Sequence, residues 1–258
     1  MTDRHVSLVT GASQGIGRAI AMRSGHAGNA VVLAARNEER LAEVADEIHS
    51  AGGEALVVPT DVTSPHDLDR VVTTAFDVYG RLDSVVANSG VGGPSGVLWE
   101  LDPAEWRGTF EVNVHGVFLT ARAAIPRMIE QGSGAVTVVG SISGKRPLYG
   151  RSAYTTTKAA LIGMVRTLAQ EAGPHGIRVN LVSPGFVAGP RLDWVISAQA
   201  AARGLTPEEI RASFEAESAL GRLTRPEDVA DTVHFLSSPE AGAITGADIN
   251  VNSGVVMY

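Results

Sequence analysis

Cysteine is absent from this 258-residue chain, and aromatic residues make up only 5% of it. Without cysteine the protein has no disulfide, no thiolate nucleophile and no cysteine-ligated metal. The seven histidines include no HExxH-type pair that would point to a zinc site. We therefore expect neither thiol chemistry nor metal chemistry.

Positive charge is also scarce: the chain has 21 Lys and Arg residues but 28 Asp and Glu residues, which gives a formal net charge of −7. Such a surface repels nucleic acid and anionic membranes overall. No apolar run approaches the roughly 18 residues of a membrane span, and residues 1–5 contain no apolar signal core. We expect a soluble, cytoplasmic protein that binds neither nucleic acid nor membrane.

What the chain does contain is an alternation of short apolar runs and amphipathic, helix-length segments. The runs are largely β-branched or leucine-rich and lack polar alternation, which is typical of strands buried on both faces. They cover 6–9, 30–34, 55–58, 84–87, 135–139, 178–182 and 248–251. This order predicts a doubly wound α/β fold, in which right-handed crossovers cover both faces of a parallel sheet.

Residues 1–258 show no linker, repeat or low-complexity tract, so we expect one domain. The least regular stretch is 185–222, which contains Phe186, Leu192 and Trp194 and a helix start at Thr206. Long irregular insertions in compact domains often act as lids. Residues 186–222 are therefore either a lid over a partly hydrophobic substrate or an ordinary amphipathic helix packed on the domain.

A glycine-rich turn, Thr-Gly-Ala-Ser-Gln-Gly-Ile-Gly, follows the first strand at residues 10–17. Glycines at Gly11, Gly15 and Gly17 permit a tight turn and let backbone N–H groups approach a pyrophosphate at the start of the next helix. The alternative is a tight strand-to-helix connection with no ligand. The strand before the turn and the helix after it favour a dinucleotide site.

Arg36 stands at the end of the second strand, nineteen residues after Gly17. An NAD site usually has an acidic residue here for the ribose 2′-hydroxyl, whereas arginine suits the 2′-phosphate of NADP. NADP(H) is therefore the preferred cofactor, and NAD(H) stays possible. The alternative is a solvated arginine beside Asn37, which would cap the next helix.

Tyr154 and Lys158 lie four residues apart where a helix is predicted to begin, so their side chains share one helix face. An ammonium group about 4 Å from a phenol, at an effective dielectric of about 20, is worth up to about 4 kcal/mol, or about 3 pKa units. Such a shift makes a tyrosine competent for proton transfer near neutral pH. By itself, however, this spacing is common on helix surfaces.

Two further polar residues support a catalytic interpretation of this pair. Ser141 follows the fifth strand, at the carboxyl end of the sheet where α/β folds bind ligands. It would hydrogen-bond a substrate oxygen, or else cap a turn, and Ser143 is a rival for the same role. Asn113, followed by Gly116, interrupts a helical run, which indicates either a functional side chain or a local distortion.

Together these motifs resemble the short-chain dehydrogenase/reductase family over residues 7–254. Residues 10–17 are similar to its cofactor turn, 61–62 to its adenine-contacting pair, 87–90 to its N-N-A-G segment, and 183–185 to the turn that supports the nicotinamide. The gap of thirteen residues between Ser141 and Tyr154 is typical of the family. The resemblance implies a Rossmann-like, seven-stranded parallel sheet in the order 3-2-1-4-5-6-7, with helices on both faces.

The resemblance also implies roles for individual residues. Tyr154 would transfer the proton, Lys158 would hold the nicotinamide ribose and lower the tyrosine pKa, Ser141 would orient the carbonyl, and Asn113 would keep a water behind Lys158. The implied cofactor contacts are Gly11, Ser13, Gln14, Gly15, Ile16, Gly17, Arg36, Asp61, Val62, Asn88, Gly90, Tyr154, Lys158, Pro184, Gly185 and Val187.

Asn113, Ser141, Tyr154 and Lys158 fit the catalytic tetrad of the family. The chain departs from the family pattern at several positions outside this tetrad. Ala87 and Ser89 replace Asn and Ala, Gly189 stands where a threonine often contacts the cofactor, and Asn-Ser-Gly at 252–254 replaces Asp-Gly-Gly. These differences bear on cofactor contacts and subfamily rather than on reaction class.

The predicted function is an NADP(H)-dependent oxidoreductase that interconverts a small-molecule carbonyl compound and its alcohol. The alternatives are a 3-oxoacyl-[acyl-carrier-protein] reductase and a non-catalytic nucleotide-binding regulator. Segments 127–131 and 168–171 are less basic than docking of an acidic carrier protein would need, which favours a free ketone or alcohol. The resemblance further implies a homotetramer or homodimer built on helices at about 103–130 and 152–172.

Overall fold

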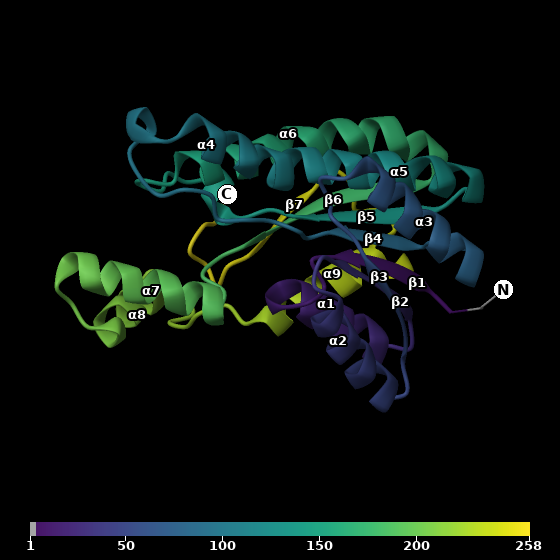
Figure 1. Cartoon of the computed structure of the whole chain (residues 1–258), viewed down its shortest axis with the longest axis horizontal. Coiled ribbons are helices and arrows are strands. Elements are labelled where there is room, and N and C mark those ends of the chain that lie inside the picture. The colour runs from purple at the N-terminus through teal and green to yellow at the C-terminus, as the bar shows by residue number, and fades with distance from the viewer. Residues whose placement is uncertain (1–3) are drawn as a thin grey trace.

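A parallel sheet forms the centre of the computed structural model, which describes residues 4–258 (Figure 1). Residues 1–3, part of the N-terminal stretch behind the cytoplasmic prediction, lie outside the described residues. In the described chain the sheet has seven strands in the order β3-β2-β1-β4-β5-β6-β7, and every neighbouring pair is parallel. The strands are β1 (Val6–Thr10), β2 (Ala30–Ala35), β3 (Glu54–Pro59), β4 (Ser84–Ala87), β5 (Gly134–Val139), β6 (Ile177–Pro184) and β7 (Asp248–Val251). The predicted fold class and strand order are confirmed.

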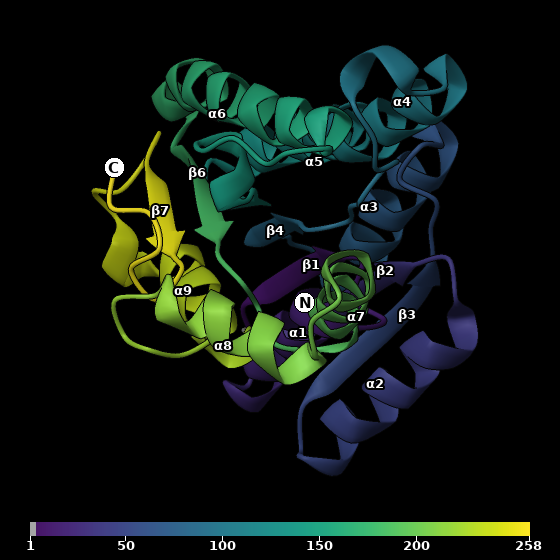
Figure 2. The same ribbon diagram turned by 90° about the vertical axis from the view of Figure 1, so that its left-hand side faces the viewer.

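Helices cover both faces of the sheet (Figure 2). One layer consists of α1 (Gly15–His26), α2 (Glu38–Ser50) and α9 (Pro226–Ser237), and the other of α3 (Pro65–Tyr79), α5 (Gly116–Gln131) and α6 (Ser152–Ala172). Successive strand residues point to opposite layers: Leu8 joins one buried core and Val9 the other. This two-sided burial is why the strands appear in the sequence as unbroken apolar runs. No helix within residues 4–258 is long and apolar enough to cross a bilayer.

The strand order reverses between β1 and β4, which creates the crevice where doubly wound sheets bind ligands. The segments that leave these two strands are tied together. The Thr10 hydroxyl oxygen accepts hydrogen bonds from the backbone N–H groups of Asn88 (3.0 Å) and Ser89 (3.1 Å), and the Asn88 side-chain amide donates to the Thr10 carbonyl (2.9 Å). The glycine turn and the segment after β4 therefore form one rigid edge of the crevice.

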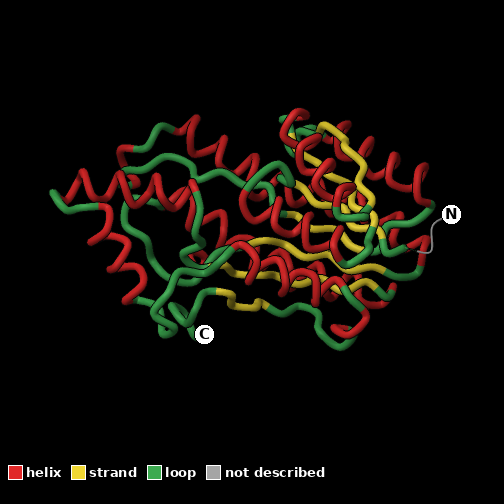
Figure 3. The backbone as a smooth tube through the Cα atoms, turned by 90° about the horizontal axis from the view of Figure 1, so that it is seen from below, coloured by secondary structure: helices red, strands yellow, loops and turns green. Residues whose placement is uncertain are grey.

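The stretch at 185–222 is more regular than the sequence indicates, because two helices occupy most of it, and the second begins after Thr206 as predicted. They are α7 (Pro190–Arg203) and α8 (Pro207–Ala216). Proline stands in the first turn of each, and α8 begins with a capping box between Thr206 and Glu209. The two helices lie beyond the carboxyl ends of the strands (Figures 1 and 3).

Helices α7 and α8 share a small apolar core that is separate from the two cores of the sheet. Its buried members are Leu192, Ile196, Ala200, Ile210, Phe214 and Leu223. A narrow neck joins this unit to the sheet: Val187 forms a β-bridge with Thr224, and the backbone of Thr224 donates to Phe186 (2.9 Å). The Phe186 ring also stacks on Phe214, with centroids 4.4 Å apart.

Candidate active site

Tyr154 and Lys158 lie in the first two turns of α6, as the sequence predicts. The Lys158 side chain is buried, and its ammonium donates a hydrogen bond to the carbonyl oxygen of Val139, the last residue of β5 (2.8 Å). The same ammonium lies 5.8 Å from the centroid of the Tyr154 ring. The pair therefore sits at the carboxyl end of the sheet, beside the crevice.

The phenol of Tyr154 is partly buried and surrounded by cationic groups. Burial alone would raise its pKa, but Lys158, Arg191, a hydrogen bond with Ser141, and Arg151 together hold the pKa of Tyr154 below its ordinary value. Burial also lowers the pKa of Lys158, against the opposing effect of Tyr154. The direction for the tyrosine agrees with the sequence-based argument, although that argument invoked the lysine alone.

Of the two roles that the sequence left open for Ser141, the structure shows the cap. The Ser141 side-chain oxygen accepts a hydrogen bond from the backbone N–H of Ser143 (3.1 Å), which caps the short 3-10 helix Ile142–Gly144. Its side chain also hydrogen-bonds Tyr154. Gly144 lets the short 3-10 helix lie close to α6, because a Cβ at this position would lie only 2.8 Å from the backbone carbonyl group of Lys158. Ser141, rather than Ser143, thus faces the tyrosine.

Asn113 lies in a π-helical turn, Glu111–His115, between α4 (Pro103–Phe110) and α5. Its side chain is completely buried. The amide oxygen accepts from the backbone N–H of Val91 (2.8 Å), and the amide nitrogen donates to the Val91 carbonyl (2.9 Å) and the Thr157 hydroxyl (3.1 Å). The local distortion that the sequence suggested is present, and it turns Asn113 toward the residue that precedes Lys158.

The glycine turn is closed toward the sheet and open on its outer side. Gly11 and Gly15 have φ values of 67° and 56°, which favour glycine. A Cβ on Gly17 would overlap the Gly11 carbonyl oxygen and the Asn88 amide nitrogen, whereas one on Gly15 would meet nothing within 4 Å. The N–H groups at the start of α1 therefore face an open space suited to an anion. Ser13, Gln14 and Ile16 belong to the same turn.

Arg36 follows β2 and is exposed, and it has no hydrogen bond or ion pair within the described part of the chain. The Asn37 side chain caps α2 by accepting from the backbone N–H of Arg40 (2.9 Å). Arg40 in turn donates to the Gln14 side chain in the glycine turn (2.8 Å). A second guanidinium that no sequence spacing had singled out thus lies beside the turn, four residues after Arg36.

The remaining predicted cofactor residues follow the carboxyl ends of β3, β4 and β6. Asp61 accepts hydrogen bonds from the Thr63 backbone and hydroxyl (2.9 and 2.8 Å). Val62 is buried. A Cβ on Gly90 would lie 3.3 Å from the Asn113 amide oxygen and 3.7 Å from the Lys158 ammonium. The others, at the β4 and β6 ends, are Asn88, Pro184, Gly185 and Val187.

Arg151 and Arg191 reach the site from the starts of two different helices, and no motif in the sequence marked either. Their guanidinium carbons lie 5.7 Å and 5.5 Å from the centroid of the Tyr154 ring. Arg151 directly precedes α6, and Arg191 is in the first turn of α7. Forty residues separate them in the chain, so only the folded structure brings them together.

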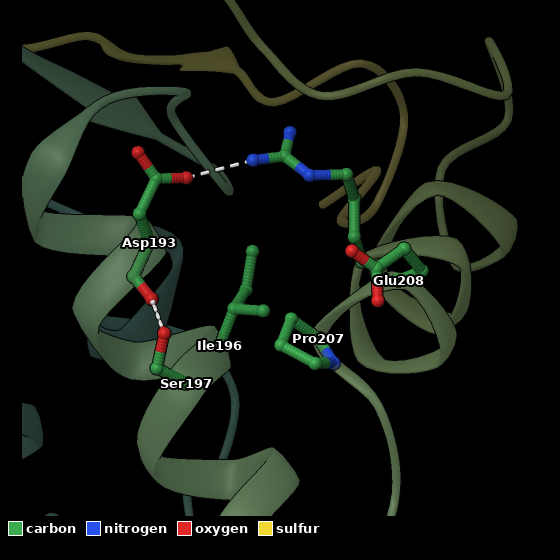
Figure 4. Close-up of a pocket in the computed structure, with 6 residues that line it drawn as sticks. Asp193, Ile196, Ser197, Pro207 and Glu208 are labelled. Atoms are coloured by element: carbon green, nitrogen blue, oxygen red, sulfur yellow. Dashed lines mark hydrogen bonds and ion pairs between the residues drawn. The ribbon is translucent and has the colours of Figure 1, made fainter.

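A second hollow, of about 170 Å³, lies between α7 and α8 (Figure 4). The ion pair between Arg211 and Asp193 (2.7 Å) spans it, and neither tetrad nor predicted cofactor residues line it. It is smaller than most ligand pockets, which measure roughly 300 Å³ or more. We therefore place the active site at Tyr154. In residues 4–258 no cluster of three or more His, Asp or Glu side chains is arranged to hold a metal ion.

Comparison with known proteins shows what this chain is similar to. Residues 11–256 match a family model described as enoyl-(acyl carrier protein) reductase. The chain is 37% identical to a cis-4-hydroxycyclohexanecarboxylate dehydrogenase from Sinomonas cyclohexanicum (96% of this chain, 95% of the relative). It is 34% identical to a 3-oxoacyl-[acyl-carrier-protein] reductase from Synechocystis sp. (98% and 97%).

Two solved structures are similar over nearly their whole length. A variant of actinorhodin polyketide ketoreductase with NADPH superimposes with a TM-score of 0.94 at 33% identity, covering 99% of this chain and 98% of that one. A 7α-hydroxysteroid dehydrogenase in complex with NADH and 7-oxoglycochenodeoxycholic acid gives 0.90 at 31% identity, covering 98% and 95%. The two cofactors differ, so likeness alone leaves the choice between NADPH and NADH open.

Proposed function

Because the chain belongs to the short-chain dehydrogenase/reductase family, we propose that it is an NADP(H)-dependent enzyme that interconverts a free ketone and its alcohol. Oxidoreduction of carbonyl and alcohol groups with a nicotinamide cofactor is common to its relatives. The observation that carries the proposal is Tyr154, whose pKa is lowered by Lys158 at the open end of the sheet. A nucleotide-binding regulator would need no such phenol.

The crevice fits a dinucleotide. The open space outside Gly15, the helix start behind it and the unpaired guanidinium of Arg36 suit a pyrophosphate and a 2′-phosphate. In this proposal the buried Lys158 binds the nicotinamide ribose. A nicotinamide cofactor, when bound there, supplies or accepts the hydride.

Tyr154 supplies the proton in this mechanism. During reduction its phenol donates a proton to the carbonyl oxygen as that oxygen gains negative charge, which completes the alcohol and leaves a phenolate. Lys158 stabilises that phenolate, and Ser141 donates a hydrogen bond to the reacting oxygen. Asn113 holds the segment after β4 in place and, in this proposal, fixes a water behind Lys158.

The charges at the ends of α5 and α6 distinguish a free substrate from an acyl group bound to a carrier protein. An acidic carrier protein would need exposed basic residues there. Arg127, near the end of α5, instead pairs with Glu130 (3.3 Å), which neutralises its charge. This pairing supports a free small molecule over a carrier-bound acyl group.

The direct test is a screen of NADPH oxidation with ketones, quinones, sugars and 3-oxoacyl thioesters, each followed by loss of absorbance of the reduced nicotinamide. We expect free ketones to be reduced with a kcat/KM at least about tenfold above that of the thioesters. Faster reduction of thioesters would favour the acyl-carrier function. Tight NADPH binding with no turnover of any compound would favour the regulator.

The cofactor preference depends on Arg36. Replacing it with alanine removes a charge expected to contact the 2′-phosphate, so the KM for NADPH should rise about tenfold or more while the KM for NADH changes little. Steady-state kinetics with both cofactors measure this ratio. Arg23→Ala is the matched control, because it removes an arginine of α1 that forms an exposed ion pair with Asp231 of α9. An unchanged ratio in Arg36→Ala would contradict the NADP assignment.

Two further proposals concern the rest of the chain. Helices α7 and α8 act as a lid over the substrate, since Arg191 in α7 already reaches Tyr154.

We also propose a homotetramer or homodimer that pairs through α4, α5 and α6. In support, Phe118 on α5 exposes 46% of its surface.

A further inference from the structure

Arg151 and Arg191 form a doubly cationic site at the rim of the active site. A Cβ placed on Gly92 would lie 2.9 Å from a terminal guanidinium nitrogen of Arg151 and 3.2 Å from one of Arg191. The two side chains therefore converge on the same point, next to the Tyr154 ring. Gly92 leaves that point free of any side chain of its own.

No acidic side chain neutralises this pair. None of the ion pairs in the described chain includes Arg151 or Arg191. Burial lowers the pKa of Arg151, the nearby Arg191 lowers it further, and only Tyr154 opposes them. Two like charges held together without a counterion, one of them on the partly buried Arg151, are unfavourable, and a bound anion would relieve that cost.

The two arginines differ in how they are held. Arg151 is fixed, since it donates to the Gly92 carbonyl (2.7 Å) and the Ser95 hydroxyl (2.9 Å), while its buried Nε has no partner. Arg191 makes no hydrogen bond or ion pair with any described residue. The guanidinium of Arg151 is thus preorganised, and the N–H donors of Arg191 are available. This arrangement is suited to binding a planar anion.

We propose that Arg151 and Arg191 bind a carboxylate of the substrate, so that the preferred substrate is an oxo acid or its hydroxy acid rather than a neutral ketone. This inference rests on the proposed function, because it places the carbonyl at the Tyr154 hydroxyl. The carboxylate then lies across the face of the tyrosine ring, a few bonds from the reacting carbon. The cationic pair both selects the acid and fixes which way round it binds.

The test uses matched pairs of oxo acids and their methyl esters on linear, cyclic and aryl scaffolds, with NADPH saturating. The wild-type protein should reduce the best acid with a kcat/KM about 30-fold or more above that of its ester. Arg191→Gln should remove most of this difference by raising the KM for the acid alone, whereas any effect on kcat through the Tyr154 phenol should be the same for acid and ester. Arg191→Lys should recover part of it. Arg203→Gln, on the exposed end of the same helix, is the control.

Each other outcome has a definite meaning. If esters are reduced as well as acids, or if Arg191→Gln affects both equally, the inference is wrong while the proposed function stands. If the variant raises the KM for NADPH instead, Arg191 serves the cofactor phosphates and the inference is also wrong. If no acid or ester is reduced but simple ketones are, the inference is wrong and the proposed function stands; if simple ketones are not reduced either, the proposed function itself fails. As an independent readout, the hydroxy acid should raise the Tm of wild type with NADP more than that of Arg191→Gln.

Discussion

Tyr154→Phe is expected to lower kcat for ketone reduction by about 10³-fold, within the range of 10²–10⁴ typical of lost acid catalysis, while cofactor affinity stays within about threefold. Phenylalanine keeps the ring that packs beside Lys158, Arg151 and Arg191 but has no proton to give. Single-turnover absorbance measurements give the rate, and fluorescence titration with NADPH gives the affinity.

The pH dependence of the wild-type protein checks the same role. Because the protonated phenol is the acid in reduction, the rate of reduction should fall as pH rises through the lowered pKa of Tyr154. The rate of alcohol oxidation should rise over the same interval, because it needs the phenolate. Near-normal turnover by Tyr154→Phe, or a reduction rate that increases with pH, would show that another group transfers the proton.

Gly17→Ala is expected to weaken cofactor binding by about 100-fold or more. The added methyl group would overlap the backbone carbonyl of Gly11 and the side-chain amide of Asn88, so the turn must move away from β4. Overpacking of this kind costs about 1–3 kcal/mol of folding free energy, which lowers the Tm by several degrees. Fluorescence titration and thermal unfolding measure the two effects.

Gly173→Ala is the matched control for this change. Gly173 has helical backbone angles (φ −55°, ψ −44°), and a Cβ there would meet nothing within 4 Å. We expect its cofactor affinity to match that of wild type, while its Tm falls slightly because Pro174 disfavours helical backbone angles in an alanine before it. If Gly17→Ala bound NADPH as tightly as Gly173→Ala, the glycine turn would not be the pyrophosphate site.

The sheet, and the position of Tyr154 and Lys158 on one helix, were predictable because local signals specify them. A strand buried on both faces appears as an unbroken apolar run, and the spacing of Tyr154 and Lys158 reflects one turn of a helix. Arg151 and Arg191 lack such a signal. Their proximity depends on where α7 meets α6, which is a tertiary contact with no fixed spacing in sequence.

Other features escaped prediction for related reasons. The contact between Arg40 and Gln14 joins the starts of two helices, and the role of Gly144 depends on how closely a 3-10 turn approaches α6. The helix at 190–203 was not identified, because its apolar residues pack into a core shared with α8 rather than against the sheet. The capping residues Thr206 and Glu209, in contrast, marked the start of α8.

Helices α7 and α8 lie beyond the neck at Val187 and Thr224, so their sequences can change without changing the sheet. Since α7 and α8 bury their apolar side chains against each other, mutations there leave the packing of the sheet intact. Substrate choice can therefore diverge among descendants of this chain while the cofactor crevice and proton donor are inherited unchanged. Transplanting 188–223 between relatives would also require matching partners for Glu217 and Ser218, which bond to Arg146 and Ser253 outside the segment.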